Sequence, residues 1–106
     1  MKTYKLSECG ERGWFIGDFA KAAYNTKDFE VTYQKNSRAQ TPSHIHKIAH
    51  EITLVISGRQ ICNGKIFEAG DICVLEPGDV SQIEYLEETE VITIKVPSIP
   101  SDKHLL

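Results

Sequence analysis

The sequence lacks any apolar segment long enough to cross a membrane. A membrane-spanning helix needs about 20 consecutive apolar residues, and no hydrophobic run of this chain approaches that length. Residues 1–5 also lack the apolar stretch that a secretory signal contains. These absences predict a cytoplasmic protein without a membrane partner.

Cysteine is scarce, and positive charge is not clustered. The chain has three cysteines, an odd number, and none of them forms a Cys-x-x-Cys pair, so reduced thiols are expected rather than a disulfide framework. The net charge is −3, and the 12 basic residues are interspersed among 15 acidic ones. Because no basic cluster exists that follows a phosphate backbone, we expect no nucleic-acid partner.

Length and composition predict one globular domain. The 106 residues are 41% hydrophobic and 25% charged, which is typical of a chain that folds around a compact core. We assign residues 1–106 to a single domain, with a core barrel over residues 28–97. Pro97 and Pro100 interrupt the pattern after that point, so residues 98–106 are expected to form a tail.

Strand-like segments recur along the chain, and turn residues separate them. The expected strands are 29–33, 51–57, 59–62, 65–68, 72–75, 80–86 and 91–96. Asn63-Gly64 stands between two of these segments, and this dipeptide favours a type I′ hairpin turn, which needs positive φ at both positions. Only residues 18–24 are expected to be helical, for about two turns. Closely spaced strands predict an all-β protein, a small antiparallel β-barrel or sandwich.

Alternation within segment 51–57 assigns its side chains to two faces. If Glu51 points into the barrel, then Ile52, Leu54 and Ile56 point outwards. The same alternation divides the last strand into two sets: Ile92, Ile94 and Val96 on one face, and Val91, Thr93 and Lys95 on the other. An apolar outer face needs a cover, which is either a second sheet of the same chain or a partner subunit. We favour a homodimer.

His44-Ile45-His46, followed by Glu51, is the strongest functional signal in the sequence. Two histidines at positions i and i+2 point to the same face of an extended strand. A tight turn over residues 47–50 would return Glu51 on the neighbouring strand. Imidazole and carboxylate are ligands of borderline divalent ions, so we expect one divalent transition metal (Zn, Mn, Fe or Ni) at His44, His46 and Glu51. His50 is an alternative third ligand, although it would lie on the opposite face of its strand.

These residues resemble the first motif of the cupin superfamily, which is His-x-His, a Glu, six intervening residues and a Gly: here His44, His46, Glu51 and Gly58. The second cupin motif is Gly-Asp, a short strand, Pro-Gly and then His; the matching residues here are Gly70, Asp71, Pro77 and Gly78. The resemblance identifies the chain as a small single-domain cupin, or monocupin. It implies an antiparallel barrel of the double-stranded β-helix (jelly-roll) type, often dimeric, that binds one divalent metal.

The sequence departs from the second motif at Ser81, where the family has a histidine. Serine is a poor ligand for a borderline ion. Two arrangements stay open: a two-histidine, one-carboxylate site with open positions, or a site in which a β-bulge brings Gln82 into the fourth position. Gln82, Tyr33 and Tyr85 are expected to contact a small molecule at the barrel mouth, and no residue is assigned as catalytic.

Three functional classes remain open at this point. The first is a metal-dependent enzyme that acts on a small polar molecule, such as a sugar derivative or a small carboxylate. The second is a non-catalytic protein that binds such a molecule, and the third is an interaction module with a relic pocket. The missing histidine and the lack of an obvious acid–base pair weaken the first class, whereas the complete first motif weakens the third. A fold that hosts many reactions does not by itself decide between them.

Overall fold

A computed structural model describes residues 1–106 as a set of short strands arranged in three sheets. The six-stranded sheet has the order β2 (Tyr24–Asn25), β1 (Trp14–Gly17), β3 (Glu30–Asn36), β12 (Thr89–Val96), β6 (His50–Ser57), β9 (Ile72–Leu75). The four-stranded sheet has the order β4 (Ala39–Gln40), β11 (Ile83–Tyr85), β7 (Arg59–Cys62), β8 (Lys65–Glu68). The three-stranded sheet is β10 (Val80–Ser81), β5 (His44–Ile45), β13 (His104–Leu105). Two 3₁₀ turns, η1 (Leu6–Glu8) and η2 (Glu11–Gly13), precede the first strand.

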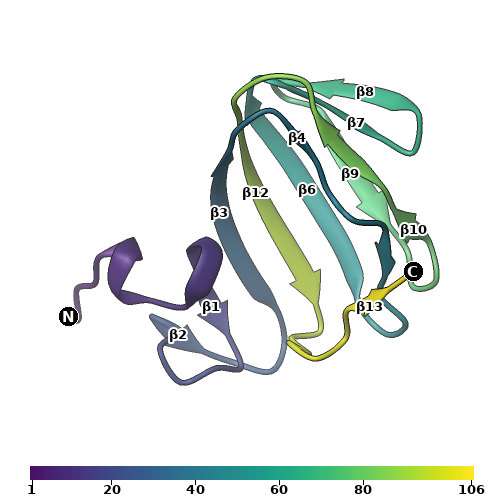
Figure 1. Ribbon diagram of the computed structural model, residues 1–106. Helices are drawn as coiled ribbons and strands as arrows, with labels where there is room; N and C mark the ends of the chain where they lie inside the picture. The colour runs from purple at the N-terminus through teal and green to yellow at the C-terminus, as the bar shows by residue number, and fades with distance from the viewer.

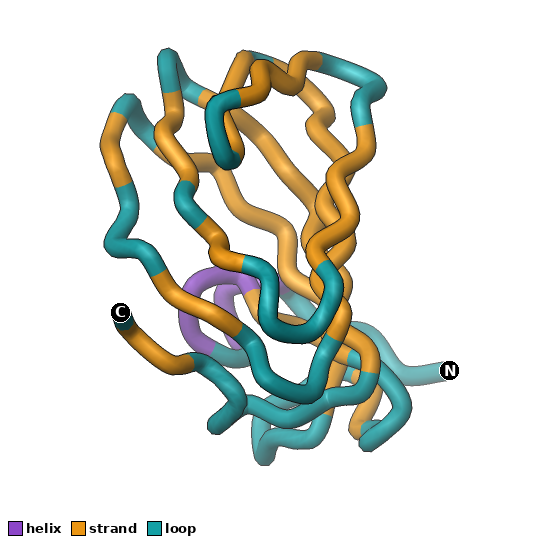
Figure 2. Tube along the Cα trace, turned by 90° about the vertical axis from the view of Figure 1, so that its right-hand side faces the viewer, coloured by secondary structure: helices purple, strands orange, loops and turns teal.

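The all-β prediction is confirmed, and the strands form a barrel-like sandwich. Figure 1 shows β3, β12 and β6 side by side as the central strands of one wall. Figure 2 shows the two walls facing each other and loops joining them at both ends. Every strand pair is antiparallel except β1 with β2. No helix of the chain has the length and apolar character that crossing a membrane requires.

The hairpin predicted at Asn63-Gly64 is confirmed. Both residues have positive φ, 51° and 82°, as a type I′ turn demands. Cys62 and Lys65 are the paired residues on either side of it.

The predicted helix at residues 18–24 is wrong. This segment bends instead, and its last residue enters β2, which pairs in parallel with β1. The Ala23 N–H donates to the Phe15 carbonyl at 2.7 Å, so the strand before it supplies the bond that a helix would have made internally. A segment this short gains too little from its own helical hydrogen bonds to resist that pairing.

The barrel extends beyond residues 28–97 at both ends. β1 pairs with β3 at the start, and at the end the segment after Pro97 returns to the barrel instead of forming a free tail. Figure 1 shows it crossing below β12 to reach β5. Asp102 within it is only 3% exposed. Segment 80–86 is also not one strand, because Gln82 separates β10 from β11 and the two join different sheets.

The expected division of faces along β6 is confirmed. Glu51, Thr53 and Val55 are buried, whereas Leu54 and Ile56 are 38% and 41% exposed. Inside the barrel, β6, β12 and β3 place side chains in cross-strand rows: Glu51 opposite Lys95 opposite Glu30, and Thr53 opposite Thr93 opposite Thr32. Polar residues outnumber apolar ones among the buried positions. The barrel interior is therefore the wall of a polar cavity rather than a purely hydrophobic core.

Candidate metal centre

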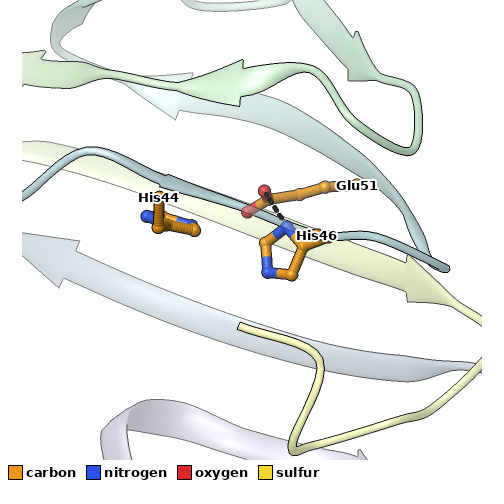
Figure 3. A group of neighbouring side chains, drawn as sticks. All are labelled: His44, His46 and Glu51. Atoms are coloured by element: carbon orange, nitrogen blue, oxygen red, sulfur yellow. Dashed lines mark ion pairs between the residues drawn. The ribbon is translucent and has the colours of Figure 1, made fainter. Parts of the chain in front are cut away.

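Strands β5 and β6 bring the three predicted metal ligands together. His44 lies in β5, His46 follows it directly, and Glu51 is the second residue of β6. Figure 3 shows the three side chains pointing toward one another between the strands. Their ligand atoms lie within 4.8 Å of one another, and all three residues are buried, at 9%, 4% and 9% exposure.

A buried carboxylate near the C-terminus holds the turn between these ligands. Asp102 accepts hydrogen bonds from the backbone N–H groups of Lys47, Ile48 and Ala49, at 3.0, 2.9 and 2.9 Å. Burial alone would raise the pKa of Asp102, but these bonds and one from His104 hold it at about 2. The turn that separates the two histidines from the glutamate is thus held by the Asp102 carboxylate, which is at least 53 residues away in the sequence.

Two buried polar atoms of these three residues have no hydrogen-bond partner. Nε2 of His46 and Oε2 of Glu51 are buried without a hydrogen bond. Nδ1 of His46 does approach Oε2 of Glu51 at 3.4 Å (Figure 3), but that approach lacks hydrogen-bond geometry. Buried polar atoms without partners are costly, and a bound cation would satisfy the Glu51 oxygen.

The donor set fits a divalent transition ion. Ligands about 2.0–2.2 Å from one ion lie about 3.5 Å apart in tetrahedral geometry, so the observed spread of up to 4.8 Å needs the side chains to move inward by about 1 Å. Two imidazoles and a carboxylate are also the chemical types that such ions prefer. Both observations support His44, His46 and Glu51 as residues that could hold the ion.

The histidines are held in the neutral state that metal binding requires. Burial lowers the pKa of His46 to about 4, with a further contribution from the Lys95 charge. Burial likewise lowers the pKa of His44. Nδ1 of His44 faces the Pro42 carbonyl at 3.4 Å, and because a carbonyl only accepts, this nitrogen carries the proton and leaves Nε2 free. Burial raises the pKa of Glu51, while Lys95 opposes that effect.

A cavity of about 530 Å³ adjoins the centre, and His44 and Glu51 are among its lining residues. This volume is in the range of small-molecule sites. Tyr33 and Tyr85 are among its lining residues, and their contact with a small molecule stays a prediction. The Tyr33 hydroxyl donates to Glu90, and this bond raises the pKa of Tyr33. Because Tyr33 and Glu90 alternate along their strands with the buried Thr32 and Val91, this hydroxyl lies on the outer face, and only Tyr85 directs its side chain to the cavity interior.

Gln82 does not reach the site, which corrects its predicted place. Its side chain is exposed, and its backbone N–H donates to Asn63. The regular pairing of β10 with β5 places Ser81 opposite His44 without a bulge. Ser81 is 0% exposed, and its hydroxyl has no hydrogen-bond partner. The position of the family's fourth ligand is therefore occupied by Ser81.

His50 does not belong to the cluster either. Its side chain is exposed, because it precedes Glu51 in β6 and so points to the opposite face. Glu51 is the third member of the group.

Lys95 is a site residue that the sequence analysis did not single out. Its side chain is only 13% exposed, and Nζ lies 4.0 Å from Glu30 and 4.8 Å from the centre of the Trp14 ring. Strand alternation put Lys95 on the face opposite Ile92, Ile94 and Val96, and that is the signal that would have found it. No comparable signal marked Asp102, because its partners are far away in the sequence.

Comparisons with known proteins agree on the fold. No family model matches the sequence, and no curated protein matches it. Among solved structures, a protein with a double-stranded β-helix domain from Klebsiella pneumoniae is 20% identical, with a TM-score of 0.65 over 92% of this chain and 85% of that one. A cupin protein from Bacteroides fragilis is 25% identical, with a TM-score of 0.58 over 68% of each chain.

A third similar structure contains a metal. The pirin YhhW of Escherichia coli, solved in complex with nickel(II), is 16% identical, with a TM-score of 0.67 over 82% of this chain and 39% of that one. Identities this low show a shared fold rather than a shared activity. Together with the strand arrangement, they show that this chain is a small protein of the cupin fold, the double-stranded β-helix.

Proposed function

We propose that the protein binds one divalent transition metal through His44, His46 and Glu51 and handles a small polar molecule in the adjoining cavity. The observation that carries this proposal is the convergence of ligand atoms from three buried residues within 4.8 Å, including a Glu51 carboxylate whose Oε2 is buried without a hydrogen bond. A pirin of similar fold, solved in complex with nickel(II), supports the proposal that this fold accommodates a divalent metal. The molecule is a sugar derivative or a small carboxylate.

Metal-assisted catalysis is the first form of this proposal. Three protein ligands leave coordination positions for water or a small molecule, and a divalent ion supplies Lewis acidity to an oxygen placed there. The chain's own residues would position the molecule: Tyr85 lines the cavity, and Lys95 provides a positive charge on the strand beside Glu51.

Binding without chemistry is the second form. Glu51 is the only carboxylate that lines the cavity, and it is used as a ligand, so no free carboxylate stands ready as a general base. This observation favours a protein that holds or senses the molecule. Turnover of a candidate compound by the metal-loaded protein would separate the two forms.

Two further proposals concern assembly and location. A homodimer would cover the exposed outer face of β6 and β9, which includes Leu54, Ile56, Ile72 and Val74. β9 is also an edge strand of the six-stranded sheet, a place where a partner often adds. The cytoplasmic location stays a prediction from the sequence.

Elemental analysis of the purified protein tests the metal centre directly. Wild type should carry one divalent ion per chain, and His44→Ala together with His46→Ala should abolish metal while the barrel stays folded. His50→Ala is the matched control, since it removes an exposed imidazole next to the cluster. Metal content that survives the double substitution, or that falls equally in the control, would place the ion elsewhere.

A further inference from the structure

The cavity beside the candidate metal centre has a charge balance opposite to that of the whole chain. The chain has 15 acidic and 12 basic residues, yet a single carboxylate lines the cavity. Four cationic residues line it: Arg12, Lys35, Lys95 and Lys103. Lys35 forms an ion pair with Glu88 at 3.4 Å, which leaves the other three to act on the cavity.

Lys95 is the most deeply placed of these cations. It stands between Glu51 and Glu30 in a cross-strand row, and its side chain is 13% exposed. Glu30 is 4.0 Å from Nζ and also accepts a hydrogen bond from Ser98 at 3.0 Å. Lys95 therefore depends on Glu51 for part of its charge compensation.

A metal ion at Glu51 would remove that compensation. The ligand carboxylate would be neutralised by the ion, while Lys95 would keep only Glu30, whose carboxylate lies 4.0 Å from Nζ and also accepts from Ser98. In formal charges, Arg12, Lys95 and Lys103 exceed Glu30 and Glu51 by one without metal, and a divalent ion raises the excess to three. An uncompensated buried cation is unfavourable, so an anion entering the cavity would relieve this excess.

Gln60 places a second, independent requirement on the ligand, which is a hydrogen-bond donor. It lies on β7 in the opposite wall, lines the same cavity and is only 1% exposed. Its Oε1 is buried and has no hydrogen-bond partner. Buried amide oxygens nearly always have a donor, and a hydroxyl on a ligand would provide one.

We infer that the cavity binds a small organic acid that carries a carboxylate and at least one hydroxyl group. Its carboxylate lies at Lys95, with Arg12 and Lys103 adding positive charge, and its hydroxyl donates to Oε1 of Gln60. The inference rests on the proposed metal centre, because the ion creates most of the positive excess. It narrows the molecule from a general polar compound to a hydroxylated carboxylate.

Three small compounds of matched size test the chemistry. Glycerate has a carboxylate and hydroxyls, propionate lacks the hydroxyls, and glycerol lacks the carboxylate. Calorimetric titration of the zinc-loaded protein should rank them glycerate, propionate, glycerol, with each step at least about 10-fold in Kd, the equivalent of one good polar contact. Glycerol binding as tightly as glycerate would overturn the anion assignment, and propionate equal to glycerate would overturn the hydroxyl contact.

Substitutions assign the contacts to residues. Lys95→Met should weaken glycerate binding at least about 10-fold, and Gln60→Met should weaken glycerate but leave propionate unchanged. Lys35→Met is the matched control. Lys35 is also a lining residue of the cavity, but its charge is already paired with Glu88. Equal losses of glycerate affinity in Lys95→Met and Lys35→Met would show that the general positive charge of the cavity, and not a specific contact with Lys95, attracts the anion.

A further comparison keeps the inference testable if Lys95→Met does not fold. Arg12→Gln combined with Lys103→Gln alters exposed residues and should still weaken glycerate binding several-fold, as the loss of two nearby charges requires. No change in this variant would count against the inference. Zinc that binds wild type without any glycerate binding would overturn the acid site alone. Failure of zinc to bind, with Lys95-dependent glycerate binding retained, would overturn only the metal centre.

Discussion

Oδ2 of Asp102 accepts a hydrogen bond from the backbone N–H of Ala49 at 2.9 Å, and this contact ties the C-terminal segment to the turn between the metal ligands. The segment also pairs through β13 with β5, the strand that carries His44. The last residues of the chain thus help to position both halves of the candidate metal centre.

Asp102→Asn should weaken metal binding. The amide keeps the size of the side chain but replaces one acceptor oxygen by a donor, so at least one of the three N–H groups loses its partner. We expect about a 10-fold loss of zinc affinity, as is found when groups that support metal ligands are removed, and a loss of about 2 kcal/mol in the free energy of unfolding. Competition with a chelating dye measures the first quantity. Unchanged zinc affinity in a less stable protein would limit Asp102 to a structural role.

The same carboxylate predicts a pH dependence of stability. The pKa of Asp102 is about 2 in the folded chain, against an ordinary 3.8. Because the folded value is the lower one, its contribution to the free energy of unfolding is complete above about pH 4 and is lost as the pH falls toward 2. Urea unfolding of zinc-free protein at a series of pH values measures this effect. Between about pH 4 and 2 the free energy of unfolding should change less with pH in Asp102→Asn than in wild type. Asp28→Asn, which changes an exposed carboxylate, should retain the wild-type change with pH.

Ser81 offers a way to close the open coordination position. It is fully buried opposite His44, with an unpartnered hydroxyl. Ser81→His should restore the family's fourth ligand and tighten zinc binding at least about 10-fold, and Ser81→Cys would add a ligand with less extra volume. Gln82→Ala is the control on the adjacent exposed position. Loss of metal in Gln82→Ala, without any gain in either Ser81 variant, would contradict the three-ligand arrangement.

The homodimer prediction concerns the outer face of β6. Leu54→Glu places a charge in the middle of the apolar face and should shift the protein toward the 11.9 kDa monomer mass in light scattering, because a buried unpaired charge is costly. Ile66→Glu, on the exposed face of β8, should leave assembly unchanged. A wild-type mass near that of one chain at micromolar concentration would rule the dimer out.

Gly58, a residue of the first motif, has a structural reason to be glycine. Its φ is 81°, and a Cβ there would meet the Glu88 carbonyl and lie 2.8 Å from Cα of Thr89. Gly64 has nearly the same φ of 82° but open space around it. Gly64→Ala should therefore cost about 1–2 kcal/mol of strain alone, and Gly58→Ala a further 1–3 kcal/mol, about what overpacking costs. Equal losses of stability in the two variants, measured by thermal unfolding, would show that the close approach of residues 88 and 89 is not the reason for glycine at position 58.

Local chemistry carried the predictions that the structure confirmed. Alternation in residues 51–57 gave the inner and outer faces of β6, because side chains on a strand alternate whatever the strand pairs with. Asn63-Gly64 predicted its turn through the φ values that these residues accept. The His-x-His spacing placed His44 and His46 near Glu51 for the same reason, since only a strand, a short turn and a second strand separate them.

The features that the sequence did not reveal depend on contacts between distant segments. Residues 18–24 form no helix because the segment bends and brings Tyr24 into β2 beside β1, and the expected tail returns because Asp102 meets the backbone of residues 47–49. Gln82 is turned out and Ser81 in by the pairing of β10 with β5. Lys95 lies between two carboxylates only because β12 pairs with β6, which carries Glu51, and with β3, which carries Glu30. The sequence by itself determined the strands, the turn and the three metal-ligand candidates. Tertiary pairing alone decided which charged residues surround those candidates, because burial and charge compensation depend on neighbours that strand periodicity does not specify.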